Sequence, residues 1–257
     1  MQAPEFVRYG LSHASALAAT LGGAWLLRSL ILSAAERRAA RTAARMLLLL
    51  ASIAILLSEI AGQIWRIRTG IWNIKTDLPL HLCDIAGIAV IWTALARAAW
   101  LARSLGPLTI RAGELAYFWT LAGSSQALLT PDLAMDFPHV AFLDFFVSHG
   151  TAWSAILGLA VSGRLRVRRG AFLPCWLITL AVGALVGLIN IPLHANYMYT
   201  CGPPGQASVY DYFGPWPLSL VTLAAVGLLL FWLCERLYFA ICPRVARIPP
   251  AASAQSE

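Results

Sequence analysis

The stretch that decides the fold runs from Tyr117 to Gly150 and reads YFWTLAGSSQALLTPDLAMDFPHVAFLDFFVSHG. Two apolar runs meet within it. Polar residues gather at their junction and continue into the second run: Gln126, Thr130, Asp132, Asp136, His139, Asp144 and His149. An ionisable side chain at membrane depth is costly unless it faces a protein interior or a wet cavity. We therefore expect two membrane-crossing helices here, with a functional site where their polar residues face inward.

The composition of the whole chain is that of a membrane protein. Of its 257 residues, 59% are hydrophobic and only 12% are charged, and the mean hydropathy is +0.70. A helix that crosses the roughly 30 Å hydrocarbon core needs about 20 apolar residues. The chain supplies seven such runs, at 11–32, 46–65, 79–100, 113–130, 139–161, 172–193 and 216–241. We predict an all-α seven-helix transmembrane bundle that forms one domain over residues 1–242, with a short disordered cytoplasmic tail at 243–257.

The distribution of Lys and Arg predicts the orientation, because cytoplasmic connections retain positive charge. Most of the 19 basic residues lie in or beside the connections that follow the first, third, fifth and seventh runs. The exceptions are Arg8, Arg66, Arg68 and Lys75. This pattern places the N-terminus outside and the C-terminus in the cytoplasm. The basic residues between 65 and 78 leave open a six-span arrangement in which that connection is inside.

The net charge, the cysteines and the first apolar run each limit the class of protein to which the chain can belong. The net charge of +7 does not indicate a nucleic-acid partner, since the basic residues flank hydrophobic runs instead of forming a patch with exposed aromatics. The five cysteines lack zinc-type spacing, and their odd number argues against a disulfide framework. The first run has no basic n-region, so we expect it to remain as the first span.

With this orientation, polar residues of the spans and loops converge on the outer leaflet. The candidate site residues are Glu59, Gln63, His81, Cys83, Asp84, Gln126, Asp132, His139, Asp144, His149, Asn190, His194, Asn196 and Tyr197. The inner halves of the same runs are nearly bare of such groups. Hydrogen bonds between packed helices, each worth about 0.6 to 2 kcal/mol, would give a scattered pattern instead. The one-sided cluster indicates a polar chamber that opens to the outside or to the outer leaflet.

One chemistry for such a chamber is metal binding. His81, His139, His149 and His194 are of a type that binds zinc, and Asp84 or Asp144 could complete the set. No two histidines have the HxxxH spacing that places two ligands on one helix, so a zinc site would need several helices to converge.

The other chemistry is nucleophilic. Cys83 would be activated by His81 or by His149, with Asp84 or Asp144 orienting the base. Since His81 and Cys83 are two residues apart, they point to different sides of a regular helix. A dyad of these two therefore requires an irregular turn after Pro79, and otherwise the base comes from another helix.

Several motifs carry a resemblance to a known family. They are Glu59 with Trp65 and Trp72, LPLHLCD at 78–84, YFW and QALLTPDL within 117–133, FPH and FFVSHG within 137–150, NYMYT at 196–200 and GPWP at 214–217. Over residues 59–217 the chain resembles the YwaF family of bacterial integral membrane proteins. It is more distantly similar to eukaryotic transmembrane protein 164, an acyltransferase that moves a fatty acyl chain onto a lysophospholipid with a cysteine and a histidine.

The resemblance implies a seven-span protein of the bacterial cytoplasmic membrane. It further implies Cys83 as the nucleophile beside His81, with His149 as the base. Leu80 and Cys83 both lie near the place of the eukaryotic cysteine. A lysophospholipid and an acyl donor would then be the partners.

These observations lead to two hypotheses of different classes. The first is an enzyme of lipid metabolism, an acyltransferase or a lipid hydrolase, without a cofactor unless zinc is bound. In it, Gln126 or Asn196 would supply hydrogen-bond donors to the oxyanion. The second is a non-enzymatic transporter, or a protein that binds metal ions or protons, with Glu59, Asp144 and the histidines as a relay. Transporters usually carry polar groups near the midplane, so the sealed inner halves favour the first.

Overall fold

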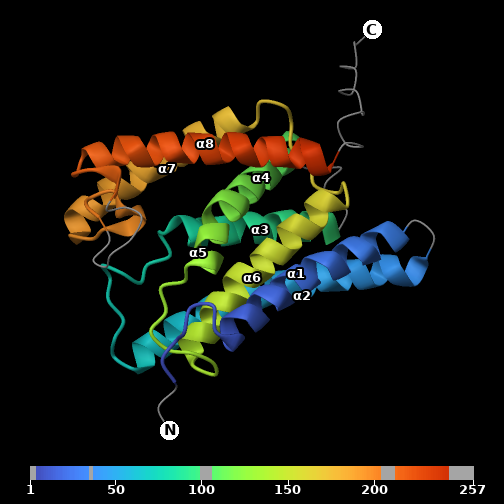
Figure 1. Cartoon of the computed structure of the whole chain (residues 1–257), viewed down its shortest axis with the longest axis horizontal. Helices are drawn as coiled ribbons and strands as arrows, with labels where there is room; N and C mark the ends of the chain where they lie inside the picture. The colour runs from blue at the N-terminus through green and yellow to red at the C-terminus, as the bar shows by residue number, and fades with distance from the viewer. Residues whose placement is uncertain (1–3, 35–36, 99–105, 204–211, 243–257) are drawn as a thin grey trace.

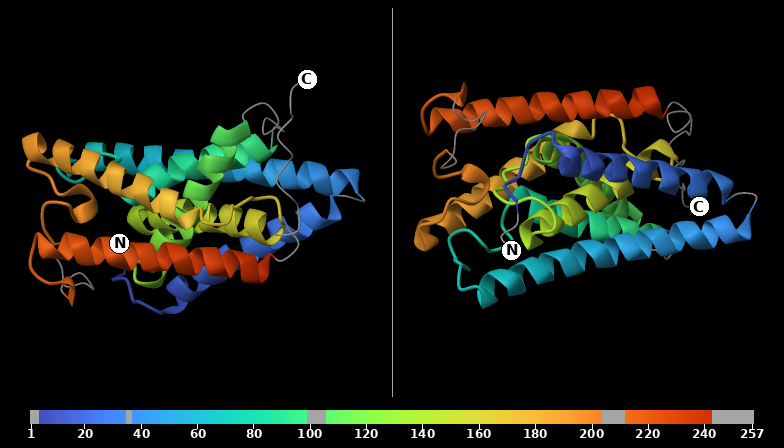
Figure 2. Two further views of the ribbon diagram at one scale, coloured as in Figure 1. Left: turned by 90° about the horizontal axis from the view of Figure 1, so that it is seen from above. Right: turned by 60° about the horizontal axis from the view of Figure 1, so that its bottom comes forward.

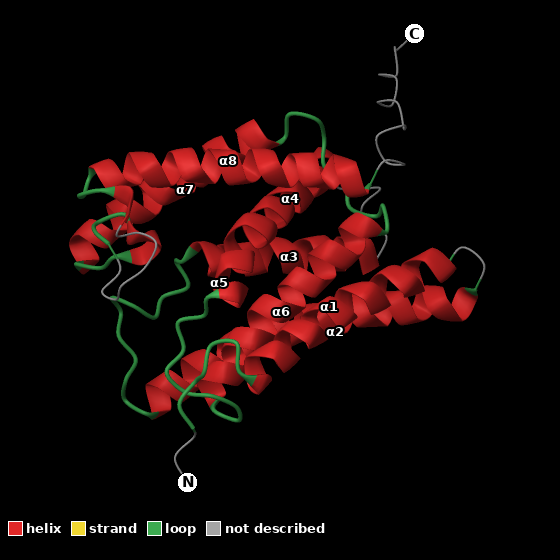
Figure 3. Ribbon diagram, in the orientation of Figure 1, coloured by secondary structure: helices red, strands yellow, loops and turns green. Residues whose placement is uncertain are grey.

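The computed structural model describes residues 4–34, 37–98, 106–203 and 212–242. This part of the chain is helical and contains no strand (Figure 3). One isolated β-bridge joins Glu5 to Met135. The predicted tail at 243–257 lies outside the described residues.

The helices follow the apolar runs of the sequence. Their bounds are α1 Leu11–Ser33, α2 Arg38–Arg68, α3 Leu82–Ala98, α4 Gly106–Phe118, η2 Trp119–Ser124, α5 Ser125–Leu129, α6 Val140–Val161, α7 Phe172–Leu193, η3 Tyr197–Tyr199 and α8 Leu218–Ile241. Within the described residues, five helices are long and apolar enough to cross a membrane, namely α1, α2, α6, α7 and α8.

The remaining two predicted spans have a different form. The third run becomes α3, which starts only at Leu82, after the turn that contains Pro79, and is described over 17 residues to Ala98. The fourth run is divided into α4, the π-helical segment η2 and the short helix α5. Neither one therefore meets the length of a regular spanning helix, although both are apolar and pack inside the bundle (Figure 1).

Helix α6 organises the packing. It contacts α1, α2 and α3, while α3 lies between α2 and α4, and α7 pairs with α8 (Figures 1 and 2). Small residues allow the close approach of α1 and α6. A Cβ added at Gly158 would lie 3.0 Å from the Ala24 carbonyl oxygen, and one at Gly150 would lie 2.7 Å from Thr20 Oγ1.

The connections between the helices lie at two opposite ends of the bundle. The N-terminal segment and the connections α2–α3, α5–α6 and α7–α8 lie at one end of the bundle, toward the left of Figure 1. The connections α1–α2 and α6–α7 lie toward the other end. The bridge between Glu5 and Met135 belongs to the first end. We call the end with the N-terminal segment the N-terminal end of the bundle, and the end with the α1–α2 and α6–α7 connections the opposite end.

The opposite end contains a buried carboxylate. Glu114 on α4 is 0% exposed. Its oxygens accept hydrogen bonds from the Arg168 backbone N–H at 3.0 Å, from Arg168 Nε and Nη2 at 2.8 Å each, and from Arg111 Nη1 at 3.0 Å. A buried charge is tolerated when it is paired and fully hydrogen-bonded. Glu114 therefore fixes the α6–α7 connection to α4.

Candidate functional site

A pocket lies where α2, α3, η2 and α6 meet. Its lining residues are Ile55, Glu59, Cys83, Ala86, Gly87, Ser124, Ser148, His149 and Ala152. The empty space is about 270 Å³ including the mouth, and its freely accessible part is about 10 Å³. The latter volume holds about one water molecule. The walls are apolar except for a group of carboxyl, thiol, hydroxyl and imidazole side chains.

Cys83 reaches this pocket from the first turn of α3. It is a free thiol. Leu80, the other candidate for the position of the nucleophile, packs instead against a separate apolar cluster that includes Val186 and Tyr197. The structure therefore gives Cys83, and not Leu80, access to the polar pocket.

His149 reaches the same pocket from α6. Its Nδ1 lies 3.0 Å from the Phe145 carbonyl oxygen and 3.1 Å from Ser148 Oγ. The ring stacks on the Phe145 ring with a centroid distance of 4.4 Å. Because a carbonyl can only accept, the Phe145 contact is satisfied when Nδ1 carries the proton, and in the neutral ring Nε2 then keeps its lone pair. This tautomer is the one that a general base needs.

Glu59 and Ser124 complete the polar lining. Glu59 projects from α2 and interacts electrostatically with Asp84, Asp144 and Arg66. Ser124 ends the π-helical segment η2 and is buried. Single π turns inside helices are frequent at functional sites. Here the π turn ends at a hydroxyl that lines the pocket.

Asp144 does not orient the His149 ring, because Nδ1 of that ring is bonded to the Phe145 carbonyl oxygen. Its carboxylate accepts from Ser58 Oγ at 3.0 Å and from Arg66 Nη2 at 3.3 Å. It also packs closely on α2, where a Cβ at Gly62 would lie 2.5 Å from Asp144 Oδ2. The structure thus places Asp144 as a link between α6 and α2.

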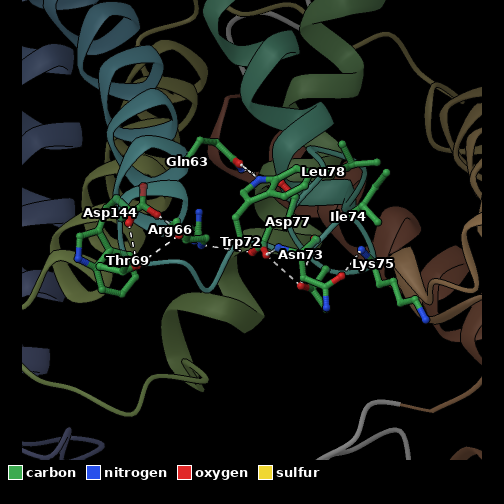
Figure 4. Close-up of polar contacts among 12 residues, drawn as sticks. Gln63, Arg66, Thr69, Trp72, Asn73, Ile74, Lys75, Asp77, Leu78 and Asp144 are labelled. Atoms are coloured by element: carbon green, nitrogen blue, oxygen red, sulfur yellow. Dashed lines mark hydrogen bonds and ion pairs between the residues drawn. The ribbon is translucent and has the colours of Figure 1, made fainter.

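Arg66 extends this link to the α2–α3 connection (Figure 4). Its Nε lies 3.4 Å from Asp77 Oδ1. Nearby, Gln63 donates to the Asp77 carbonyl at 2.8 Å and accepts from Trp72 Nε1 at 2.9 Å. Gln63 is therefore engaged in holding the connection and does not line the pocket.

His81 and Asp84 flank Cys83 in sequence but make other contacts. Asp84 Oδ2 accepts from the His81 backbone N–H at 2.9 Å, which caps the start of α3. The His81 ring lies edge-on to Tyr197, and its Nδ1 accepts from the Met198 backbone N–H at 3.4 Å. Its ring faces the α7–α8 connection.

Asn190, Asn196 and Tyr197 shape that connection. Asn190 is buried and bonds the Tyr197 backbone through both ends of its amide. The Tyr197 hydroxyl donates to the Ile74 carbonyl at 2.7 Å and accepts from the Leu78 N–H at 2.9 Å. Asn196 bonds the backbone of Cys201 and Gly202. These three residues join the α7–α8 and α2–α3 connections and lie outside the pocket.

The other predicted residues are dispersed. His139 is the N-cap of α6, accepts from the Ala141 N–H at 3.2 Å and meets Trp65 edge-on. Gln126 and Asp132 are exposed, and so is His194, which is the C-cap of α7. In the described part of the chain, no three His, Cys, Asp or Glu side chains are grouped to hold a metal ion. The four histidines of the predicted zinc set make separate contacts.

Sequence reasoning did not select Ser58, Arg66, Ser124 or Ser148 as site residues, although Ser124 lies in the polar stretch of the fourth run and Arg66 is a charged neighbour of Glu59. Serines in apolar runs are common and give no distinctive pattern, because they often only permit close helix packing. The spacing of Ser148 next to His149 was visible, but only the helix geometry shows both at one pocket.

The fold and the pocket define a polytopic α-helical membrane protein with a buried polar site between its helices. The model of the TMEM164 family matches residues 8–234, so the chain belongs to the TMEM164 family. The comparison with curated proteins and the comparison with solved structures each give no match.

Proposed function

We propose that the protein is a thiol-dependent acyltransferase that moves a fatty acyl chain between membrane lipids. The observation that carries this proposal is the presence of Cys83 and His149 in one pocket. A thiol and an imidazole with a free Nε2 are the two parts that covalent acyl transfer requires. Membership in the TMEM164 family supports the same assignment.

The proposed setting is the bacterial cytoplasmic membrane, with seven crossing segments and the N-terminus outside. Segments α3 and α4–η2–α5 would cross along with the five long helices. The described connections are compatible with this count, since those after α2, α5 and α7 lie at the N-terminal end of the bundle and those after α1 and α6 lie at the opposite end. The α5–α6 and α7–α8 connections, which contain no Lys or Arg, would then face outward, as the positive-inside rule requires. The α2–α3 connection would face the same side, although Arg66, Arg68 and Lys75 lie in or beside it.

The reaction follows from the groups that line the pocket. His149 Nε2 takes the proton of Cys83, and the thiolate attacks the carbonyl carbon of an acyl ester in the donor lipid. The ester C–O bond breaks, His149 returns the proton to the leaving alkoxide, and a lysolipid departs. The hydroxyl of an acceptor lysophospholipid then attacks the thioester, His149 takes its proton, and Cys83 leaves and is reprotonated. Water in place of the acceptor would give hydrolysis.

Ser124 takes the part of oxyanion donor in this proposal. It lines the pocket, whereas Gln126 is exposed and Asn196 bonds the backbone of a loop. A positioned hydroxyl that meets the developing oxyanion is worth about 10² to 10³ in rate. Glu59, whose carboxyl group lines the pocket, would orient the hydroxyl of the acceptor lysophospholipid.

The accessible part of the pocket is small, so only the carbonyl end of the substrate would enter it. The acyl chain would extend between helices toward the lipid. Leu56 on α2 and Ile88 on α3 are 50% and 66% exposed and belong to the helices that form the pocket. Apolar side chains of this kind provide a surface along which a chain can lie.

The test is a turnover assay on the full chain reconstituted in vesicles, with a labelled phospholipid donor and an unlabelled lysophospholipid acceptor. We expect label to appear in the acceptor, and Cys83→Ala or His149→Ala to lower the rate by about 10² to 10⁴. Cys201→Ala, which changes an exposed free thiol, serves as the matched control. Equal rates in all four proteins would refute the assignment.

A further inference from the structure

The opposite end of the bundle contains a group of arginines that the proposed reaction does not use. Arg164 and Arg166 lie in the α6–α7 connection, where exposed arginines alternate with the buried residues Leu165 and Val167. The arginine side chains therefore face solvent while Leu165 and Val167 face the protein interior. The apolar residues anchor the segment while the guanidinium groups project from it.

The anchoring places this segment against the end of α3. The Leu165 carbonyl accepts from the Tyr238 hydroxyl at 2.7 Å. A Cβ at Gly113 would lie 3.0 Å from Leu165 Cδ1 and 3.8 Å from Thr93 Cγ2. Thr93 is one helical turn from Arg97. Leu165 and Thr93 therefore both pack at Gly113 of α4, which brings the segment near the end of α3 that carries Arg97. The positive charges of Arg164 and Arg166 act on Arg97.

This group lacks a counter-charge in the described structure. Arg97 Nε is buried and has no hydrogen-bond acceptor among the described residues. The nearby carboxylates are already engaged, since Glu114 pairs with Arg111 and Arg168. Glu235 accepts from two backbone N–H groups at the start of α7. A buried donor without an acceptor is costly, and three like charges placed together repel, so the site is suited to an anion.

We propose that Arg97, Arg164 and Arg166 bind the phosphate of an anionic phospholipid headgroup. Guanidinium groups match phosphate oxygens in geometry and charge. The arginines lie at the end of α3, beside helices with apolar outer faces, so a lipid bound here keeps its acyl chains in the bilayer. Under the proposed orientation this is the inner leaflet, at the end of the bundle away from the Cys83 pocket. The proposal does not depend on any activity at that pocket.

Native mass spectrometry of the full chain in detergent tests the site, with phosphatidylglycerol as probe and phosphatidylcholine as the zwitterionic reference. We expect preferential binding of phosphatidylglycerol, weakened about fivefold by Arg166→Gln and similarly by Arg97→Gln. Arg169→Gln is the matched control, because Arg169 lies in the same connection but stacks on Phe239 at 4.5 Å. Arg166 is exposed, so this variant keeps the test valid if Arg97→Gln fails to fold.

Two results would overturn the proposal. One is binding of phosphatidylglycerol that is the same in the wild type, Arg166→Gln and Arg169→Gln. The other is displacement of the lipid by inorganic phosphate alone at comparable concentration, because the site would then recognise a free anion and not a headgroup held at the membrane surface.

Discussion

Arg66 on α2 pairs with Asp144 on α6 at 3.3 Å, and this contact sets the distance between the two helices that carry Glu59 and His149. The same guanidinium reaches Asp77 in the α2–α3 connection at 3.4 Å. One cation therefore joins three parts of the chain beside the pocket.

Replacing Arg66 should destabilise this junction. In Arg66→Gln, Asp144 and Asp77 lose a charged partner while Ser58 alone continues to hold Asp144. We expect the free energy of unfolding to fall by about 1.5 to 3 kcal/mol, the usual range for a hydrogen bond to a charged group. Thermal unfolding in detergent measures it. Arg68→Gln, an exposed neighbour on α2, should unfold like the wild type, and an equal loss in both variants would contradict this role.

Gly62 should tolerate no side chain. A Cβ there would lie 2.5 Å from Asp144 Oδ2 and 2.8 Å from its Cγ. Gly62→Ala must therefore either displace the Asp144 carboxylate from Ser58 and Arg66 or push α2 and α6 apart, and we expect a loss of about 1 to 3 kcal/mol. Gly22→Ala on α1 is the control, because nothing lies within 4 Å of its Cβ. A Gly62→Ala protein as stable as Gly22→Ala would refute the close contact.

Replacing His149 on α6 and replacing the N-cap residue His139 should distinguish a catalytic role from a structural one. His149→Ala removes the proposed base and should reduce acyl transfer by about 10² to 10⁴. His139→Ala removes the N-cap of the same helix, so it should cost about 0.5 to 2 kcal/mol in stability and preserve turnover at a temperature where the protein is folded. Rates and melting curves of both variants check this. Loss of turnover in folded His139→Ala would assign it to the site.

The helical membrane fold was predictable because apolar runs of about 20 residues have few alternatives in a bilayer. The starts of α1, α6, α7 and α8 lie within two residues of the runs proposed for them. The interruption of the fourth run by a π turn was not predictable, since hydropathy reports composition and not the hydrogen-bond register. For the same reason, the hydropathy of the third run did not indicate that regular helix begins only at Leu82.

The site was predictable only in part. Cys83, His149 and Glu59 stood out as polar groups in apolar runs, and the structure brings them to one pocket. Asn190 also lies in an apolar run, and Asn196 and Tyr197 lie in the loop that follows it. The partners of these three residues include backbone groups of the connections. Sequence shows that a polar group must be satisfied at membrane depth. It does not show whether a neighbouring loop or a ligand satisfies it.

The buried carboxylate at the opposite end should be among the most sensitive positions. Glu114→Gln keeps the shape of the side chain but leaves Arg168 and Arg111 without an anionic partner. Breaking a buried ion pair costs about 3 to 5 kcal/mol, although the exposed Arg168 side chain can recover part of it in water. We expect a clear fall in the melting temperature, absent in the exposed control Glu5→Gln. Unchanged melting of Glu114→Gln would show that the pair contributes nothing.

Acylation of Cys83 is the step on which the proposed reaction rests, and intact-protein mass spectrometry after incubation with a phospholipid donor detects it. We expect one added acyl mass, located on the peptide that contains Cys83, released by hydroxylamine and absent from Cys83→Ala but present in Cys201→Ala. Transfer of label to the lysophospholipid with no acyl adduct at Cys83, or with undiminished rate in Cys83→Ala, would contradict it.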